Sequence, residues 1–114
     1  MPQRRDNRRI EYEVFANRLI RTVTLPDGRT YTHRCSRKVY ENVAYQVEEW
    51  SDRGATMEEL AVAIDAPYSQ VNVTLEFLKE RGCVVTRWRR SYPASNCLYE
   101  DAMTEFTFLT EQGA

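Results

Sequence analysis

The chain has 114 residues, of which 42% are hydrophobic, and this suits one domain with a single modest core. No apolar run approaches the roughly 20 residues that a membrane-spanning helix needs, so we expect no membrane partner. Residues 1–10 are charged and no apolar stretch follows them, so we expect no secretory signal. The three cysteines, Cys35, Cys83 and Cys97, lack CxxC spacing, which argues against a disulfide framework or a zinc site and favours a cytoplasmic setting.

Charge is segregated along the chain, although the formal net charge is only -1. Residues 1–38 carry a net charge of +6, residues 39–80 carry -7, residues 81–97 carry +4 and residues 98–114 carry -4. Arginine outnumbers lysine 14 to 2, and arginine can hold phosphate or carboxylate groups with two parallel hydrogen bonds. The arginine-rich segments therefore predict either recognition of a polyanion or pairing with the acidic middle of the chain, and both alternatives stay open.

The N-terminal third predicts a basic arm followed by strands. Residues 1–9 are polar and basic with nothing to bury, so we expect a disordered arm. Residues 10–15 alternate like a short strand, although a helical turn also fits. Residues 19–25 and 29–35 are rich in β-branched and aromatic residues and flank a Pro-Asp-Gly turn, which predicts a β-hairpin over residues 19–35.

Apolar residues that recur at helical spacing predict three helices in the middle of the chain, at about residues 37–52, 57–65 and 68–81. Ser36 can cap the first helix. Thr56 and Glu59 have the spacing of a capping box, which predicts the start of the second helix. Pro67 suits the beginning of the third helix, because the N–H group that proline lacks would be unpaired there, and Gly82 ends it.

After the third helix, residues 83–100 predict a two-stranded ribbon. We expect residues 97–100 to form its returning strand. Strand alternation puts Arg87 and Arg89 on one face, where they can meet solvent or phosphate. It puts Trp88 and Arg90 on the other face, and we expect Trp88 to pack under the ribbon. The alternative is a solvated edge strand whose charges prevent aggregation.

The C-terminal segment, residues 101–112, fits two structures. Met103, Phe106 and Leu109 recur at a spacing of three, which suits a helix, whereas Phe106 and Phe108 alternate like a strand. We expect a helix. Its apolar residues Met103, Phe106 and Leu109 could then supply a face for a homodimer.

Two motifs in the middle of the chain have the spacing of a helix, a tight turn and a second helix that ends at glycine. They are Thr56-x-x-Glu59-Leu60-Ala61-x-Ala63-Ile64 and Ser69-x-Val71-x-x-x-Leu75-x-x-Leu78-x-x-Arg81-Gly82-x-Val84. Together with residues 36–100 they resemble the winged helix-turn-helix superfamily of bacterial-type DNA-binding regulators. The resemblance implies an α+β domain over residues 10–114, with a three-helix core and a two-stranded wing. To this the chain adds the N-terminal β-hairpin and a C-terminal helix.

In that superfamily the third helix enters the major groove of DNA and the wing touches the adjacent backbone. Carried over to this chain, the implied contacts are Tyr68, Ser69, Gln70 and Asn72 on the helix and Arg87, Arg89 and Arg90 on the wing. The amides of glutamine and asparagine can hydrogen-bond base edges. Basic arms can enter a minor groove, which adds the candidates Arg4, Arg5, Arg8 and Arg9. We therefore expect a sequence-specific DNA-binding protein that regulates transcription.

The third helix departs from the pattern of DNA-binding relatives. Its outer side carries Glu76 and Glu80, which repel phosphate, and no arginine. Val73 and Phe77 lie on the same side, opposite the core stripe, because a helix turns about 100° per residue. They are covered by the hairpin or C-terminal helix of the same chain, by a partner or second subunit, or by thymine methyl groups. These features favour the alternative function, a winged-helix protein–protein interaction module without DNA binding.

Residues for catalysis or metal binding are sparse. His33 is the only histidine, and no cysteine or aspartate stands at ligand spacing from it. The sequence has neither a Gly-x-Ser-x-Gly motif nor a glycine-rich phosphate loop. We therefore expect no enzyme, no metal site and no cofactor.

Overall fold

The computed structural model describes residues 7–113, and these form an α+β fold with four helices and two antiparallel sheets. In chain order the elements are β1 (Arg9–Phe15), β2 (Arg18–Thr24), β3 (Thr30–Ser36), α1 (Arg37–Glu49), α2 (Met57–Ile64), α3 (Tyr68–Glu80), β4 (Val84–Arg87), β5 (Arg90–Pro93) and α4 (Leu98–Gln112). Arg4 and Arg5 of the predicted arm lie outside the described residues, whereas Arg9 is the first residue of β1. Within the described range, no helix combines the length and apolar character that crossing a membrane requires.

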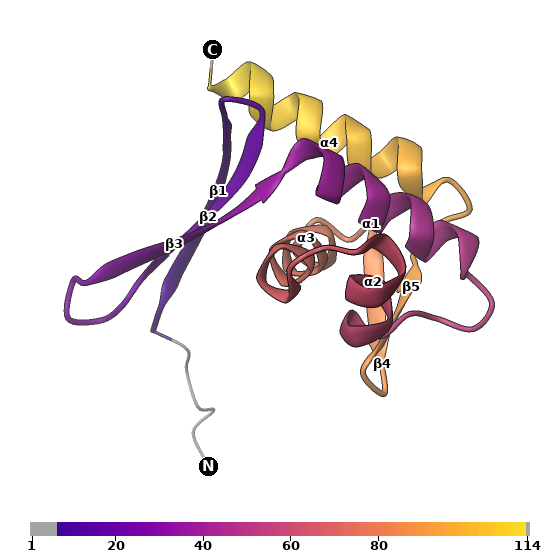
Figure 1. The fold of residues 1–114 in the computed structure, drawn as a ribbon. Helices are drawn as coiled ribbons and strands as arrows, with labels where there is room; N and C mark the ends of the chain where they lie inside the picture. Colours follow the sequence, from indigo (N-terminus) through magenta and orange to yellow (C-terminus); the bar gives the residue numbers. More distant parts are fainter. Residues whose placement is uncertain (1–6, 114) are drawn as a thin grey trace.

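The first three strands form an antiparallel meander in the order β1-β2-β3 (Figure 1). Residues 10–15 belong to β1, which pairs with β2 along its whole length, so the strand alternative is the one that forms. The chain reverses between these strands at Ala16 and Asn17, whose φ angles of 52° and 64° are both positive. The predicted hairpin of β2 and β3 follows, and its turn contains Gly28 at φ 91°.

Local hydrogen bonds fix the starts of the first two helices. Ser36 caps α1, because its hydroxyl accepts a hydrogen bond from the Val39 N–H at 3.2 Å. The capping box of α2 is present in both directions, with Thr56 Oγ1 accepting from the Glu59 N–H and Glu59 Oε1 accepting from the Thr56 N–H, each at 3.1 Å. These bonds join residues three apart, which is why the sequence predicts both helix starts correctly.

Helix α3 lies between the sheet and α1 (Figure 1). On the sheet side, the rings of Tyr12 from β1 and Phe77 have centroids 5.0 Å apart. Cys35 Sγ of β3 lies 3.1 Å from Thr74 Oγ1. Val73 and Phe77 are 1% and 0% exposed as a result.

The interpretation of Val73 and Phe77 as partner or dimer residues is therefore wrong. In the structure, the N-terminal strands of the same chain cover Val73 and Phe77, which is one of the alternatives that the sequence left open. Helical periodicity identifies the two residues as an apolar face opposite the main stripe. It contains no information on which distant segment covers that face.

The C-terminal segment is helical, as expected, and α4 packs on α1 and on the end of β1. Phe106 and Leu109 are 1% and 3% exposed, and Met103 is partly buried against the same core. The Phe106 ring lies 5.0 Å from that of Tyr40 in α1. Phe106 and Leu109 fill the core of the chain, so assigning them to a dimer surface is wrong. Met103 also lines a shallow surface hollow on α4 with Phe108, and its assignment to a dimer face stays a prediction.

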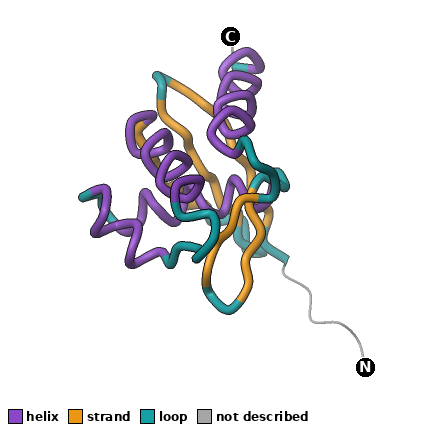
Figure 2. The backbone as a smooth tube through the Cα atoms, turned by 90° about the vertical axis from the view of Figure 1, so that its right-hand side faces the viewer, coloured by secondary structure: helices purple, strands orange, loops and turns teal. Residues whose placement is uncertain are grey.

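The predicted ribbon is shorter than expected. Its second strand is β5, and the proposed returning strand at residues 97–100 instead contains the start of α4. The reversal occurs at Trp88 and Arg89, whose φ angles are 52° and 67°. Neither is a glycine or asparagine, the residues that such turns favour, so no local signal marks the position. Figure 2 shows β4 and β5 as a hairpin that projects from the helices, and we call it the wing.

Candidate nucleic-acid interface

About a third of the circumference of α3 stays at the surface, on the side that faces neither α1 nor the sheet. The residues of this sector are exposed or half-buried and are Tyr68, Ser69, Asn72, Glu76, Lys79 and Glu80. Three of the four predicted base-reading residues are among them. The sector also holds two carboxylates against one ammonium group, so it is acidic where a DNA-binding helix is usually basic.

Gln70 does not belong to this sector. Its Oε1 accepts a hydrogen bond from the backbone N–H of Ser36 at 3.0 Å, across the junction of β3 and α1. Gln70 thereby supplies the partner for a half-buried backbone donor. Its amide oxygen is thereby occupied, which leaves the amide N–H groups as donors to a base, and the role of Gln70 in reading DNA stays a prediction.

Tyr68, Asn72 and Arg89 line one groove, of about 200 Å³, between α3 and the wing. Thus the helix and wing residues that the sequence predicts separately come together in space. The floor of the groove includes Glu58 from the first turn of α2.

Glu58 links the two walls of this groove. Its Oε2 accepts a hydrogen bond from the Tyr68 hydroxyl at 3.2 Å and lies 3.7 Å from Nη2 of Arg89. The Arg89 side chain is nevertheless 86% exposed, so the ion pair is weak and Arg89 can reach a phosphate. The sequence analysis missed Glu58, because its role depends on the fold of α2 against the wing.

Arg90 has a structural role. Its Nη1 lies 3.1 Å from Glu59 Oε1 and donates to the Gly54 carbonyl at 3.3 Å, which ties β5 to the start of α2. The same carboxylate is approached by Arg53 Nη1 at 3.3 Å. With its charge paired and its side chain bonded to the start of α2, Arg90 is a weaker candidate for phosphate than Arg89, and its predicted DNA contact stays a prediction.

These contacts hold the pKa of Glu59 near 2, below its ordinary value of 4.5, mainly through the hydrogen bond from the Thr56 N–H and then through Arg53 and Arg90. A lowered pKa in the folded chain stabilises the fold above about pH 4.5, and this stabilisation is lost as the pH falls toward 2. Glu59→Gln is therefore expected to melt at a lower temperature than the wild type at neutral pH, with the gap closing under acid. A gap that is constant across that range, measured by circular dichroism, would contradict this assignment.

The tip of the wing is the most exposed aromatic feature among the described residues. Trp88 is 95% exposed, so the expectation that it packs under the ribbon is wrong. The turn at Trp88 and Arg89 replaces the strand alternation on which that expectation rested. Arg87 stacks over the Tyr92 ring at 4.8 Å, which leaves its guanidinium at the surface beside Trp88.

Two further sequence candidates lie at the start of β1. Arg8 immediately precedes the strand, and Nε of Arg9 is 3.9 Å from Glu11 Oε1. Neither residue lines the groove between α3 and the wing. Their assignment to a minor-groove arm stays a prediction.

Comparison of the chain with family models, curated proteins and solved structures finds no match. Among residues 7–113, no group of three or more histidine, cysteine, aspartate or glutamate side chains is arranged to hold a metal ion. Burial raises the pKa of the Cys35 and Cys83 thiols to about 11. Both cysteines therefore act as small apolar core residues.

Proposed function

We propose that the protein is a winged helix-turn-helix domain that binds duplex DNA through the exposed sector of α3 and the wing. The order of elements supports this proposal, since three helices are followed by a β-hairpin. Ala55, between α1 and α2, also pairs with Ser91 of β5 and adds a short third strand position to the wing. In this arrangement α3 is the element that meets a groove of DNA.

One observation carries the proposal: Tyr68 and Asn72 share a groove with Arg89 of the wing. Asparagine can bond an adenine edge with two hydrogen bonds, and hydroxyl groups bond phosphate or base edges. Arg89, at the turn of the wing, lies where the DNA backbone flanking that groove would run. Arg87 is exposed on the other face of the wing, over the Tyr92 ring, and is a second candidate for phosphate. The two classes of contact that DNA recognition needs, base reading and phosphate binding, therefore come from adjacent elements.

The charges on this face limit the affinity. Two carboxylates, Glu58 and Glu76, stand against two cations, Lys79 and Arg89, so the groove is close to neutral. Binding then depends on a few arginine–phosphate contacts rather than on a strongly positive surface. We expect non-specific dissociation constants on the order of 10⁻⁴–10⁻⁶ M at physiological salt.

Fluorescence anisotropy with a labelled duplex, titrated between about 50 and 200 mM salt, tests the proposal. Two to four phosphate contacts predict a slope of log affinity against log salt between about -2 and -4, since each contact contributes about 0.9. Absence of binding at the lowest salt, or binding that does not change with salt, would overturn it.

Glu58→Gln is expected to strengthen DNA binding. The amide keeps hydrogen-bonding capacity toward Tyr68 and removes a negative charge 3.7 Å from Arg89. We expect a gain of roughly threefold to tenfold at about 50 mM salt, with a steeper salt slope, because Arg89 becomes fully available to phosphate. Glu111→Gln, at the far end of α4, removes the same charge outside the groove and is the matched control. Equal affinities for the two variants would contradict the role of Glu58.

A second function, a protein-interaction module of the same fold, is favoured by Trp88. A tryptophan that is 95% exposed at the end of a rigid hairpin is the kind of residue that anchors protein interfaces. If this function is the correct one, Trp88→Ala abolishes binding of a protein partner, and that binding changes little with salt. Under the DNA proposal the same variant leaves the salt slope unchanged, because no phosphate-binding cation is lost.

A further inference from the structure

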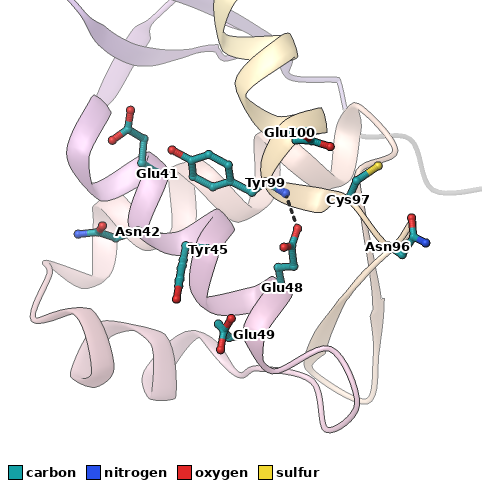
Figure 3. Close-up of a pocket in the computed structure, with 9 residues that line it drawn as sticks. All are labelled: Glu41, Asn42, Tyr45, Glu48, Glu49, Asn96, Cys97, Tyr99 and Glu100. Atoms are coloured by element: carbon teal, nitrogen blue, oxygen red, sulfur yellow. Dashed lines mark hydrogen bonds between the residues drawn. The ribbon is translucent and has the colours of Figure 1, made fainter.

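A second concave surface lies on the outer side of α1, where it meets the start of α4 (Figure 3). Its volume is about 760 Å³. The residues that determine its chemistry are Glu41, Tyr45, Glu48, Glu49, Tyr99 and Glu100. We call it the α1–α4 groove. It shares no residue with the groove between α3 and the wing.

The α1–α4 groove has the chemistry of a site for guanidinium groups. It holds four carboxylates, and no basic residue is among the described residues that line it. Tyr45 and Tyr99 are 51% and 37% exposed, so their rings are open to a stacking cation. Arginine suits such a site because it pairs with carboxylates and stacks on aromatic rings at the same time.

The walls of the α1–α4 groove are fixed by a contact between its two helices. Glu48 Oε1 accepts a hydrogen bond from the Tyr99 N–H at 2.8 Å, which the dashed line in Figure 3 marks. Glu41 is held by Arg37 of its own helix at 2.9 Å. Glu49 and Glu100 have no basic partner within residues 7–113 and are the carboxylates that an incoming cation would meet.

The chain itself contains a segment of matching chemistry. Residues 1–9, MPQRRDNRR, carry four arginines and one aspartate. Arg9 belongs to β1, whereas Arg4 and Arg5 precede it and match in sign and number the carboxylates of Glu49 and Glu100. Complementary charges of this kind steer association and set its specificity.

The position of β1 indicates that the segment reaching the α1–α4 groove belongs to another molecule. Val14, near the end of β1, lies beside Gly113 at the C-terminal end of α4, whereas the α1–α4 groove is at the N-terminal end of that helix. Helix α4 is about 22 Å long, which separates the α1–α4 groove from the end of β1. Arg9, the first residue of β1, lies six residues before Phe15, at the opposite end of the strand (Figure 1). Arg5 is only four residues before Arg9, and four residues span at most about 14 Å when fully extended. A second copy can present its segment without crossing the molecule.

We propose that the α1–α4 groove binds Arg4 and Arg5, in the segment that precedes β1, of a second copy of the chain, so that two copies exchange arms. Arg4 and Arg5 of each copy meet Glu49 and Glu100 of the other, with Tyr45 and Tyr99 stacking on the guanidinium groups. The resulting dimer is held by charge and weakens as salt rises. It does not depend on DNA, because the α3 and wing face takes no part in it.

Two variants with exchanged charges test the proposal. Light scattering of the full chain, without DNA, measures the mass of each variant and of their mixture. The wild type is expected to form dimers at about 50 mM salt and to dissociate in high salt. Arg4→Glu with Arg5→Glu, and separately Glu49→Arg with Glu100→Arg, each place like charges together, so each double variant alone is monomeric. An equimolar mixture of the two restores the dimer mass, because both arm–groove contacts are again between opposite charges.

Thermal melts of each variant show that it is folded, and Glu111→Arg, at the other end of α4, is the control that keeps the dimer. A wild type that is monomeric at low salt overturns the proposal. Persistence of the dimer in either double variant, or failure of the mixture to restore it, overturns it equally. DNA binding is measured on the same samples, so loss of one activity is distinguished from loss of the other.

Discussion

Phe77→Ala is expected to lower the free energy of unfolding by about 3–5 kcal/mol. The side chain is fully buried between the N-terminal sheet and the helices, with the rings of Tyr12 and Tyr40 at 5.0 and 6.1 Å and the Arg81 guanidinium at 5.2 Å. Truncation removes these contacts and leaves a cavity that the rigid surroundings cannot fill. Chemical unfolding followed by circular dichroism measures the loss.

Phe108→Ala is the matched control for this experiment, because it makes the same truncation on α4 at a side chain that is 48% exposed. Its cost is expected to be within about 1 kcal/mol. If Phe77→Ala were no more costly than this control, the sheet would not cover α3 in solution. The face with Val73 and Phe77 would then be open to a partner.

Replacing Arg87 and Arg89 together by alanine is expected to weaken binding to duplex DNA roughly tenfold and to reduce the salt slope by about 2. Arg89 lines the groove that contains Tyr68 and Asn72. Arg87 is the other exposed arginine of the wing and is stacked over the Tyr92 ring. Binding of the protein releases about one counterion from DNA for each phosphate that an arginine neutralises. Loss of each arginine therefore reduces the salt slope by about 0.9. Anisotropy titrations at several salt concentrations measure both quantities.

Arg90→Ala serves as the contrasting variant in the same experiment. Because Arg90 is paired with Glu59 and bonded to Gly54, its loss is expected to lower the melting temperature and to leave the salt slope nearly unchanged. A change of slope in Arg90→Ala as large as in the Arg87 and Arg89 variant would show that phosphate contacts are spread over the whole wing. That result would remove the distinction between structural and DNA-facing arginines.

The two concave surfaces differ in charge and in position. The groove between α3 and the wing is close to neutral, whereas the α1–α4 groove is strongly acidic. An acidic groove repels nucleic acid, so the two proposals assign ligands of opposite charge to the two surfaces. This division reflects the alternation of basic and acidic segments along the sequence, which the fold gathers into separate faces.

The wing shows where prediction from the sequence fails. Two β-branched residues after Gly82 and the arginines around Trp88 indicate a ribbon, and a ribbon forms. The position of its turn could not be predicted, since Trp88 and Arg89 adopt positive φ without the glycine or asparagine that usually marks such a turn. Because the turn lies at Trp88 and Arg89 rather than further along the chain, Trp88 is exposed and Arg90 pairs with Glu59.

The starts of α1 and α2 follow from the sequence, because caps such as Ser36 and the pair Thr56 and Glu59 act over three residues of chain. The start of α4 at Leu98 does not, since the sequence pattern predicts a strand there. The sequence by itself also determined which residues are apolar and where charge accumulates. Only the tertiary structure decided which of these residues are at the surface. Gln70 bonds to a residue 34 positions away and Phe77 packs on Tyr12, so their roles depend on contacts between segments that no local pattern connects.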